Sequence, residues 1–326
     1  MSEIQVSICC LVYNQEKYLR KCLDGLLMQK TNFAFEILIH DDASTDSSAD
    51  IIREYEKKYP NIIKPIYQTE NQFSKGIKIS LVHQFPRSQG KYIAFCEGDD
   101  YWCDENKLQL QYDEMEKNEN AVFCAHDVGT VSEDGVLLED TFPKKKIEKM
   151  ISSQRMLSVM EENNMYPFQT SSYFVVAKYL KNLYRNMPKF MQVSNVGDVP
   201  LMLYLLTKGD VIYINKKMSY YRVGSVQGWN TLFRDSNSKR ILQIKNGIAS
   251  YCLYDVYTEG EYTDTIKSII LQDWFNLLLL VRDYRQINNK IFRKYYKNMP
   301  LKNRVYLKLC GLCPLFEKVY AAYKKK

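Results

Sequence analysis

Residues 91–102 read KYIAFCEGDDYW. The first six form a short, largely apolar run, which is typical of a strand covered on both faces in a parallel sheet. Glu97, Asp99 and Asp100 follow at once. Adjacent carboxylates at the end of a buried strand are costly unless a cation or hydrogen bonds offset their charge. The pattern therefore indicates a site for Mg²⁺ or Mn²⁺ completed by substrate phosphates. The alternative is that these acids only cap a helix that begins near Glu105.

The same alternation of strand and helix precedes this segment. Apolar runs at 6–12 (VSICCLV), 35–40 (FEILIH) and 62–67 predict three further strands. Helical spacing of apolar residues predicts helices after the first two of them, and 77–83 is expected to be helical before the strand at 91–96. Asn14 occupies the position of a cap for the first helix. Strands alternating with helices at these lengths predict an α/β fold with a doubly wound sheet over residues 1–125.

Polar side chains follow the strands of this predicted sheet where each strand ends. Tyr13 and Asn14 follow the first strand, and Asp41 and Asp42 follow the second. Ligands bind at the carboxyl ends of the strands in such sheets, because loops and helix N-termini converge there. Asp42 is placed to accept a hydrogen bond from a nucleobase or a ribose hydroxyl. It could equally be the N-cap of the helix that follows.

The second half of the chain is less regular. We expect strands at 121–131, 171–177 and 211–214, the last leading to Tyr221 and Arg222, and a helix at 198–207. Beyond about residue 230 the pattern is helical. Asp198, at the head of an apolar helix in the other half of the chain, is the best candidate for a general base, although an Asp before Val-Pro is also a common cap.

Composition and charge indicate where in the cell the protein is located and which classes of partner it could bind. The 326 residues carry a net charge of +7, and residues 285–326 contain twelve Lys or Arg against the single acid Glu317. The nine cysteines are scattered, the first residues have no basic and apolar leader, and no apolar run reaches the ~20 residues that a spanning helix needs. A cytoplasmic location is expected, and nucleic acid is the weakest of the partners that such a charge would suit.

Five motifs occur in order along the chain: VSICCLVYNQEKYLRKCLDGLLMQ, FEILIHDDASTDSS, GKYIAFCEGDDYW, GDVPL and YYR. This order resembles family 2 glycosyltransferases of the GT-A fold, especially bacterial capsule, exopolysaccharide and adhesin-glycan enzymes, over about residues 4–230. The resemblance implies a Rossmann-like mixed sheet flanked by helices, followed by a helical, basic extension over 231–326. Residues 1–125 would bind the nucleotide sugar and 126–230 the acceptor.

The resemblance also implies roles for single residues. Tyr13, Asn14, Asp41, Asp42 and Asp99 would bind the donor nucleotide. Asp100, with Asp99, would bind the metal ion, and Glu97 takes the place of the first acid of a DxD-like motif. Asp198 would be the catalytic base.

One position departs from the family pattern. Relatives often carry a His two residues after the Tyr-Arg pair, where this chain has Gly224. Arg222 could take over its contact with phosphate, because a guanidinium pairs bidentately with phosphate oxygens. Trp102 and Trp229 could stack on sugar faces, or they could simply be core residues.

These observations predict an inverting glycosyltransferase that moves a sugar from a nucleotide diphosphate donor, UDP being favoured, to a saccharide acceptor on a lipid or protein carrier. The alternatives are a sugar nucleotidyltransferase and a non-catalytic, glycan-binding relative. The tail interleaves Leu301, Val305, Tyr306, Leu309 and Leu312 with Lys and Arg, which suits a helix lying on an anionic membrane. It suits equally a solvated helix or a contact in a homo-oligomer.

Overall fold

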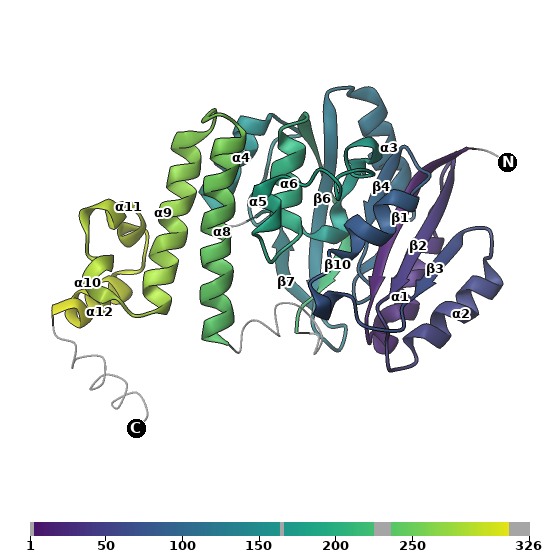
Figure 1. Ribbon diagram of the computed structural model, residues 1–326, viewed down its shortest axis with the longest axis horizontal. Helices are drawn as coiled ribbons and strands as arrows, with labels where there is room; N and C mark the ends of the chain where they lie inside the picture. Colours follow the sequence, from purple (N-terminus) through teal and green to yellow (C-terminus); the bar gives the residue numbers. More distant parts are fainter. Residues whose placement is uncertain (1–2, 164–165, 225–235, 313–326) are drawn as a thin grey trace. The chain divides into compact units, whose positions relative to one another are not determined.

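The computed structural model describes residues 3–163, 166–224 and 236–312 (Figure 1). The chain divides into two compact units. The first comprises residues 1–188 and 197–232, and the second comprises 189–196 and 233–326. The first unit is an α/β structure and the second is helical.

The first unit is built on a ten-stranded mixed sheet. Its strands are β1 (Ile4–Val12), β2 (Ala34–Asp41), β3 (Ile63–Tyr67), β4 (Tyr92–Phe95), β5 (Tyr101–Trp102), β6 (Ala121–Val131), β7 (Leu137–Phe142), β8 (Met150–Ile151), β9 (Phe174–Val176) and β10 (Asp210–Arg222). Its helices are α1 (Glu16–Leu27), α2 (Ser48–Lys58), α3 (Lys107–Lys117), α4 (Ser153–Asn163) and α6 (Asp198–Leu206).

The strands run in the order β3-β2-β1-β4-β9-β6-β10-β5, with β7 beside β6 and β8 beside β10. Strands β3, β2, β1 and β4 are mutually parallel, whereas β9 is antiparallel to both β4 and β6. Val12 pairs with Asp41 at the ends of β1 and β2. The expected mixed, doubly wound sheet is therefore present, and the carboxyl ends of its parallel strands meet at one edge.

The core of this unit is built from side chains at every second position of the strands and from the apolar faces of the helices. Val6, Ile8, Cys10 and Val12 of β1 contribute to one buried cluster. Helix α1 adds to this cluster the residues of its apolar face: Leu19, Cys22, Leu23 and Leu26. Burying a side chain of this size stabilises the fold by roughly 1.5–3 kcal/mol, so this cluster holds the strand ends that carry the polar residues.

Three local predictions differ from the structure. Residues 77–83 do not form a regular α-helix: a π-turn at Ser80–Gln84 is followed by a 3-10 turn at Phe85–Arg87, where Pro86 lacks the N–H that an α-helix would use. The strand expected at 211–214 continues to Arg222 as β10. Helix α1 has Gln15 rather than Asn14 at its N-cap.

The second unit contains α5 (Lys189–Gln192), α8 (Asn237–Tyr257), α9 (Thr263–Leu280), α10 (Tyr284–Ile287), α11 (Arg293–Lys297) and α12 (Leu301–Leu312). Helices α8 and α9 lie side by side (Figure 1). A small core joins α9 to the helices after it through Phe275, Leu278, Ile287, Phe292, Tyr295 and Leu307. None of the helices in the described ranges has both the length and the apolar character needed to cross a bilayer.

Candidate active site

The acidic segment forms a tight loop between β4 and β5. Its backbone continues the pairing with β1, since Gly98 donates its N–H to the carbonyl of Leu11 at 2.9 Å. A Cβ at residue 98 would lie 2.3 Å from Oε1 of Gln15 and 3.1 Å from Cγ2 of Val12. A side chain at this position would displace the end of the Gln15 side chain and press on Val12, so glycine suits the close approach of the loop to β1.

Arg222, the last residue of β10, ties this loop to the rest of the sheet. Its N–H donates to Oδ1 of Asp100 at 2.9 Å, and its Nε donates to the carbonyl of Asp99 at 3.0 Å. Its Nη1 donates to the carbonyls of Ser132 and Glu133 at 2.9 and 3.0 Å. These bonds commit Nε and Nη1 to backbone oxygens, so Arg222 positions the acidic loop. A contact of Arg222 with the diphosphate stays a prediction.

Four carboxyl groups, Glu97, Asp99, Asp100 and Asp198, share this region, and their charges raise the pKa of Glu97 and of Asp100. The protein atoms around Glu97 displace part of its hydration, and together with the charges of Asp99 and Asp198 this raises the pKa of Glu97 to about 8. Part of the Glu97 side chain is still exposed to solvent. Burial, Asp99 and Glu97 likewise raise the pKa of Asp100, which is 3% exposed. Such a cluster favours the binding of a cation, because a cation offsets the cost of ionising all of its members.

A divalent ion fits this chemistry, and its ligands would be few. The described residues hold no group of three or more His, Cys, Asp and Glu side chains arranged for a metal ion. Mg²⁺ and Mn²⁺ are commonly held by one or two carboxylates, with substrate phosphates and water supplying the other ligands. Asp100 and Asp99 are the residues that would supply the protein's share.

Asp198 begins α6 and comes close enough to the acidic loop to raise the pKa of Glu97. Burial raises the pKa of Asp198 itself. Its Oδ1 accepts the N–H of Val199 at 2.8 Å, while Gly197 occupies the N-cap. The structure thus brings Asp198, which is 98 positions or more from the loop in sequence, into the same electrostatic cluster.

Two tyrosines that the sequence analysis missed also belong to this cluster. The rings of Tyr166 and Tyr173 meet edge to face, with centroids 6.0 Å apart. Their buried hydroxyls have no hydrogen-bond partner within the described part of the chain. Asp198 contributes to raising the pKa of each phenol, and burial is the main cause. No sequence motif marks either tyrosine: Tyr173 lies in the predicted strand 171–177, where an aromatic residue reads as core, and Tyr166 lies in a segment without a recognisable pattern.

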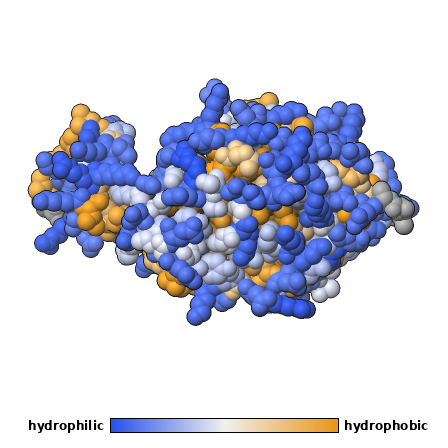
Figure 2. All heavy atoms as spheres, turned by 90° about the horizontal axis from the view of Figure 1, so that it is seen from above, coloured by the Kyte–Doolittle hydropathy of each residue, from blue (hydrophilic) through white to orange (hydrophobic). Residues whose placement is uncertain are grey.

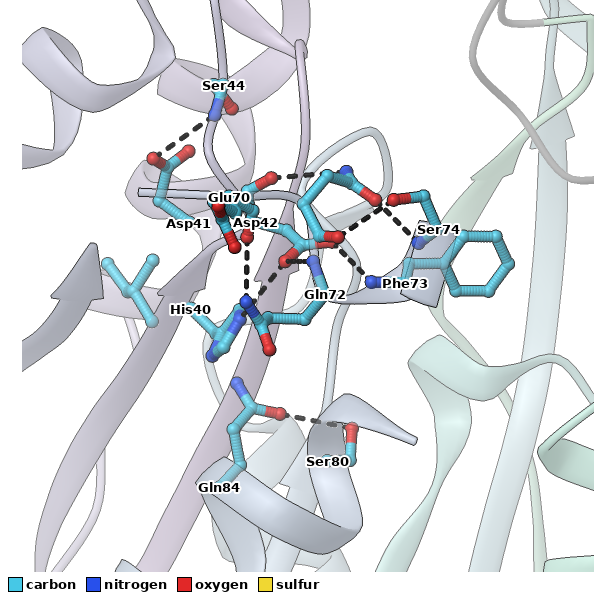
Figure 3. Close-up of polar contacts among 12 residues, drawn as sticks. His40, Asp41, Asp42, Ser44, Glu70, Gln72, Phe73, Ser74, Ser80 and Gln84 are labelled. Carbon is cyan, nitrogen blue, oxygen red and sulfur yellow. Dashed lines mark hydrogen bonds and ion pairs between the residues drawn. The ribbon is translucent and has the colours of Figure 1, made fainter. Parts of the chain in front are cut away.

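Asp41 is the last residue of β2 and Asp42 follows it, and the two side chains differ in their surroundings (Figure 3). Oδ1 and Oδ2 of Asp42 accept the N–H groups of Gln72 and Phe73 at 2.7 and 3.0 Å. Asp42 therefore anchors the 3-10 turn Phe73–Lys75, and the alternative that it caps α2 is wrong.

Oδ1 of Asp41 is buried without a partner among the described residues. A buried, unsatisfied carboxylate oxygen at a sheet edge is what a bound ligand would pair with.

His40 lies directly beneath Asp42. Its Nε2 is 3.6 Å from Oδ1 of Asp42 (Figure 3). The centroid of its ring is 5.0 Å from that of the His83 ring. Burial and the neighbouring His83 lower the pKa of His40 to about 4. The imidazole is therefore neutral at pH 7 and packs under the loop as an uncharged ring.

Asn14 links the ends of β1 and β2. Its Oδ1 accepts the N–H of Thr45 at 2.7 Å, and its own N–H donates to Oγ of Ser44 at 3.0 Å. Its φ of 50° lies in the left-handed region, which Asn adopts more readily than most residues. Tyr13, the residue before it, is half-buried at the same edge.

Trp102 corrects one prediction. Its ring is 1% exposed, and its Nε1 donates to the carbonyl of Ser171 at 3.1 Å. The ammonium of the buried Lys107 lies 3.8 Å from the centre of the ring and donates to Gln111 at 2.6 Å. With no open face for a sugar, Trp102 is a core residue that anchors β5. Trp229 lies outside the described residues.

The position of the absent His also has a structural explanation. Gly224 has a φ of 87°, a conformation that a side chain such as His would strain. The local backbone after β10 is therefore adapted to glycine, and the cation nearest the acidic loop in this part of the chain is Arg222 instead.

Comparisons with known proteins agree with this geometry. Residues 7–174 match the family described as Glycosyl transferase family 2. An uncharacterized protein of Mycobacterium tuberculosis is 32% identical over 233 residues, 71% of this chain and 62% of the relative. The chain thus spans somewhat less than two thirds of the length of that relative.

Two solved structures share the fold. One is TarS of S. aureus in complex with UDP-GlcNAc, with a TM-score of 0.55, 16% identity, and coverage of 99% of this chain and 92% of that one. The other is the mannosyltransferase PcManGT of Pyrobaculum calidifontis in complex with GDP-Man and Mn²⁺, with a TM-score of 0.51, 12% identity, and coverage of 96% and 88%. The expected GT-A fold is confirmed. The chain is a member of glycosyl transferase family 2.

Proposed function

We propose that the protein is an inverting glycosyltransferase of bacterial surface-glycan synthesis. It would transfer a sugar from a nucleotide diphosphate donor, with UDP favoured, to a saccharide acceptor on a lipid or protein carrier at the cytoplasmic side of the cell. The observation that carries the proposal is that Asp198, at the start of α6, lies close enough to Glu97 for its charge to raise the pKa of Glu97, so a candidate base lies near the candidate cation site of the acidic loop.

The donor would lie along the edge where β1, β2 and β4 end. Tyr13, Asn14 and Asp41 line its nucleoside end, and the unpartnered Oδ1 of Asp41 supports a ligand there. Asp42 would act through the turn that it anchors. TarS, whose fold this chain shares, binds UDP-GlcNAc, and this supports UDP; PcManGT binds GDP-Man, so GDP is the competing choice.

The reaction would be a single displacement. Asp198 would accept the proton of the acceptor hydroxyl while that oxygen forms its bond to the anomeric carbon. The bond from this carbon to the donor phosphate breaks on the opposite face, and the configuration inverts. The raised pKa of Asp198 suits a base that works near neutral pH, because a general base is most effective when its pKa lies near the working pH.

A Mg²⁺ or Mn²⁺ ion held by Asp100 and Asp99 would neutralise the charge that develops on the departing diphosphate. Arg222 would contribute by keeping the acidic loop in place, since it binds the side chain of Asp100 and the carbonyl of Asp99. The Mn²⁺ bound to PcManGT supports this choice of ion.

A panel of nucleotide sugars tests the proposal. The protein would be melted with UDP-, GDP- and TDP-linked sugars, with and without Mn²⁺. A ligand at one hundred times its Kd adds about 2.7 kcal/mol to the free energy of unfolding, which for a chain of this length corresponds to a rise of roughly 4 °C in Tm. We expect the sugars of one nucleotide class to raise Tm in the presence of Mn²⁺. We expect the protein to convert the same donor to its free nucleoside diphosphate.

Three results would decide against the proposal. Failure of every nucleotide sugar to raise Tm would remove the donor site. Release of pyrophosphate from a nucleoside triphosphate and a sugar phosphate would favour the nucleotidyltransferase. Binding of a saccharide without any donor turnover would favour the non-catalytic relative.

A further inference from the structure

Helix α12 carries two apolar faces. On one face, Leu307 and Cys310 are buried, and Leu307 packs in the core with Phe292 and Tyr295. The ring of Tyr306 meets that of Tyr284 edge to face, with centroids 6.3 Å apart. This face is fully accounted for by the fold of the second unit.

The opposite face holds a row of exposed apolar side chains. Leu301, Val305, Leu309 and Leu312 follow one another at intervals of four, four and three residues, which places them in one row at about 100° per residue. They are 67, 50, 39 and 76% exposed. We call these four residues the α12 stripe. Figure 2, a view from above, shows that hydrophobic residues are also exposed among hydrophilic ones elsewhere on the surface.

Basic side chains flank the α12 stripe. Lys302 and Lys308 are exposed and fall on either side of the stripe at the same helical spacing. From Tyr284 to Leu312 the chain has no acidic residue and eight basic ones: Arg285, Lys290, Arg293, Lys294, Lys297, Lys302, Arg304 and Lys308. The apolar row is bordered by lysines and lies in a segment without acids. Such a surface is complementary to a partner that has an apolar interior beneath a layer of negative charge.

We infer that the α12 stripe docks onto a lipid bilayer containing anionic headgroups, with the helix in the plane of the membrane. The four apolar side chains would enter the boundary of the acyl chains, and Lys302 and Lys308 would reach the phosphates. A second copy of the chain is a poorer occupant. A two-fold contact would bring together two surfaces that are both bordered by lysines and that lie in a segment without acids, so positive charge would meet positive charge. The inference concerns binding alone and does not depend on the proposed sugar transfer.

Vesicle flotation with the full chain tests this inference. The probes are phosphatidylcholine vesicles with and without phosphatidylglycerol, at low and high salt. We expect binding to the anionic vesicles only, weakened by salt. Lys302→Glu with Lys308→Glu should weaken binding by roughly fivefold or more for each position, because each basic group near an anionic surface contributes about that factor. Val305→Glu with Leu309→Glu should abolish binding.

A matched control is available in α8, where Val256 is 75% exposed and lies outside the stripe. Val256→Glu should leave flotation unchanged, and all variants should keep the wild-type Tm, since every changed side chain is exposed. Equal binding to neutral and anionic vesicles, equal loss in Val256→Glu, or undiminished binding in the stripe variants would overturn the inference. So would a wild-type dimer, measured by light scattering, that the stripe variants convert to a monomer while vesicles bind neither form.

Discussion

The main-chain N–H of Arg222 and Oδ1 of Asp100 are joined by a hydrogen bond of 2.9 Å, although 122 residues separate the two in sequence. The side chain of the same arginine reaches the carbonyls of Asp99, Ser132 and Glu133. Its guanidinium also lies 4.1 Å from the ring centre of Tyr18. The end of β10 therefore holds the acidic loop, a segment of β6–β7 and helix α1 together.

Arg222→Lys should lower the stability of the protein while keeping the charge. A lysine ammonium cannot span three carbonyls and stack on Tyr18, so buried oxygens lose partners at about 1–3 kcal/mol each. We expect a fall in Tm and a weaker response of Tm to Mn²⁺, both measured by thermal unfolding. A variant with normal Tm and Mn²⁺ response but a raised KM for the donor would instead assign Arg222 to the diphosphate.

Asp100→Asn should remove the effect of Mn²⁺ on Tm and lower kcat/KM by at least about a hundredfold, because the ion that offsets charge on the leaving group loses a ligand. Asn keeps an acceptor for the N–H of Arg222, so the fold is retained. The control is Asp134→Asn, which changes a carboxylate that is 84% exposed and pairs with Lys17. If Mn²⁺ still stabilised the Asp100 variant fully, another group would hold the metal.

Asp198→Asn should lower transfer by roughly a hundred- to ten-thousandfold, the usual contribution of a general base, with donor affinity unchanged. Transfer would be followed by release of the nucleoside diphosphate and donor affinity by the shift in Tm. Asp264 holds the same first-turn place in α9 and is exposed, so Asp264→Asn is the matched control. Transfer at near-normal rates would show that Asp198 is a structural residue.

Tyr173→Phe tests the unpartnered phenols beside Asp198. Removing a buried hydroxyl that binds no protein group should leave Tm unchanged or slightly raised. If a substrate forms a hydrogen bond with the Tyr173 hydroxyl, the KM for that substrate should rise in the variant while Tm changes little. A fall in Tm of several degrees with unchanged KM would show that the hydroxyl serves the fold alone. Donor and acceptor KM values, measured separately, identify the substrate involved.

Lys107→Met should change how stability depends on pH. Burial lowers the pKa of Lys107 from 10.5 to about 7, so the unfolded chain holds this proton over the window between these values while the folded chain has released it. The free energy of unfolding therefore gains up to about 1.4 kcal/mol per pH unit from this group as pH rises from 7 towards 10. Below pH 7 the penalty of burying the charge is fully present.

Methionine has a similar shape and does not titrate. Relative to the wild type, we expect the Lys107→Met variant to be most stable at or below pH 7 and to lose this advantage as pH rises. Denaturant unfolding at pH 7, 8 and 9 measures the difference, in which the other titrating groups cancel. A difference that stayed constant with pH would mean that Lys107 remains charged in the fold, held by the ring of Trp102 and by Gln111.

Much of the α/β architecture was predictable, because it depends on local patterns. Runs such as 6–12 and 35–40 are short, largely apolar and rich in β-branched residues, which favours strands covered on both faces. The end of each run is marked by residues that favour caps and turns. Parallel pairing then brings the ends of β1, β2 and β4 to one edge, so the gathering of Asp41, Asp42 and Asp99 there followed from the sequence.

The contacts of single side chains were not predictable in this way. The sequence left Asp42 as a nucleobase ligand or a helix cap, and the structure made it the anchor of a turn thirty residues further along. The sequence allowed Trp102 to stack on a sugar or to be a core residue, and the structure shows a buried ring that packs against Lys107. The sequence suggested phosphate as a partner of Arg222, which stays a prediction, but it did not indicate that the carbonyls of Asp99 and Ser132 accept hydrogen bonds from the guanidinium.

The sequence by itself determined which residues end the strands and therefore which acids meet at the edge of the sheet, because strand period and burial are local properties of the chain. The tertiary structure alone decided which of those polar groups are already paired with protein atoms and which are open to a ligand. The reason is physical: a buried donor or acceptor takes whatever partner the fold brings within about 3 Å, and segments 70 to 120 residues apart in sequence supply those partners.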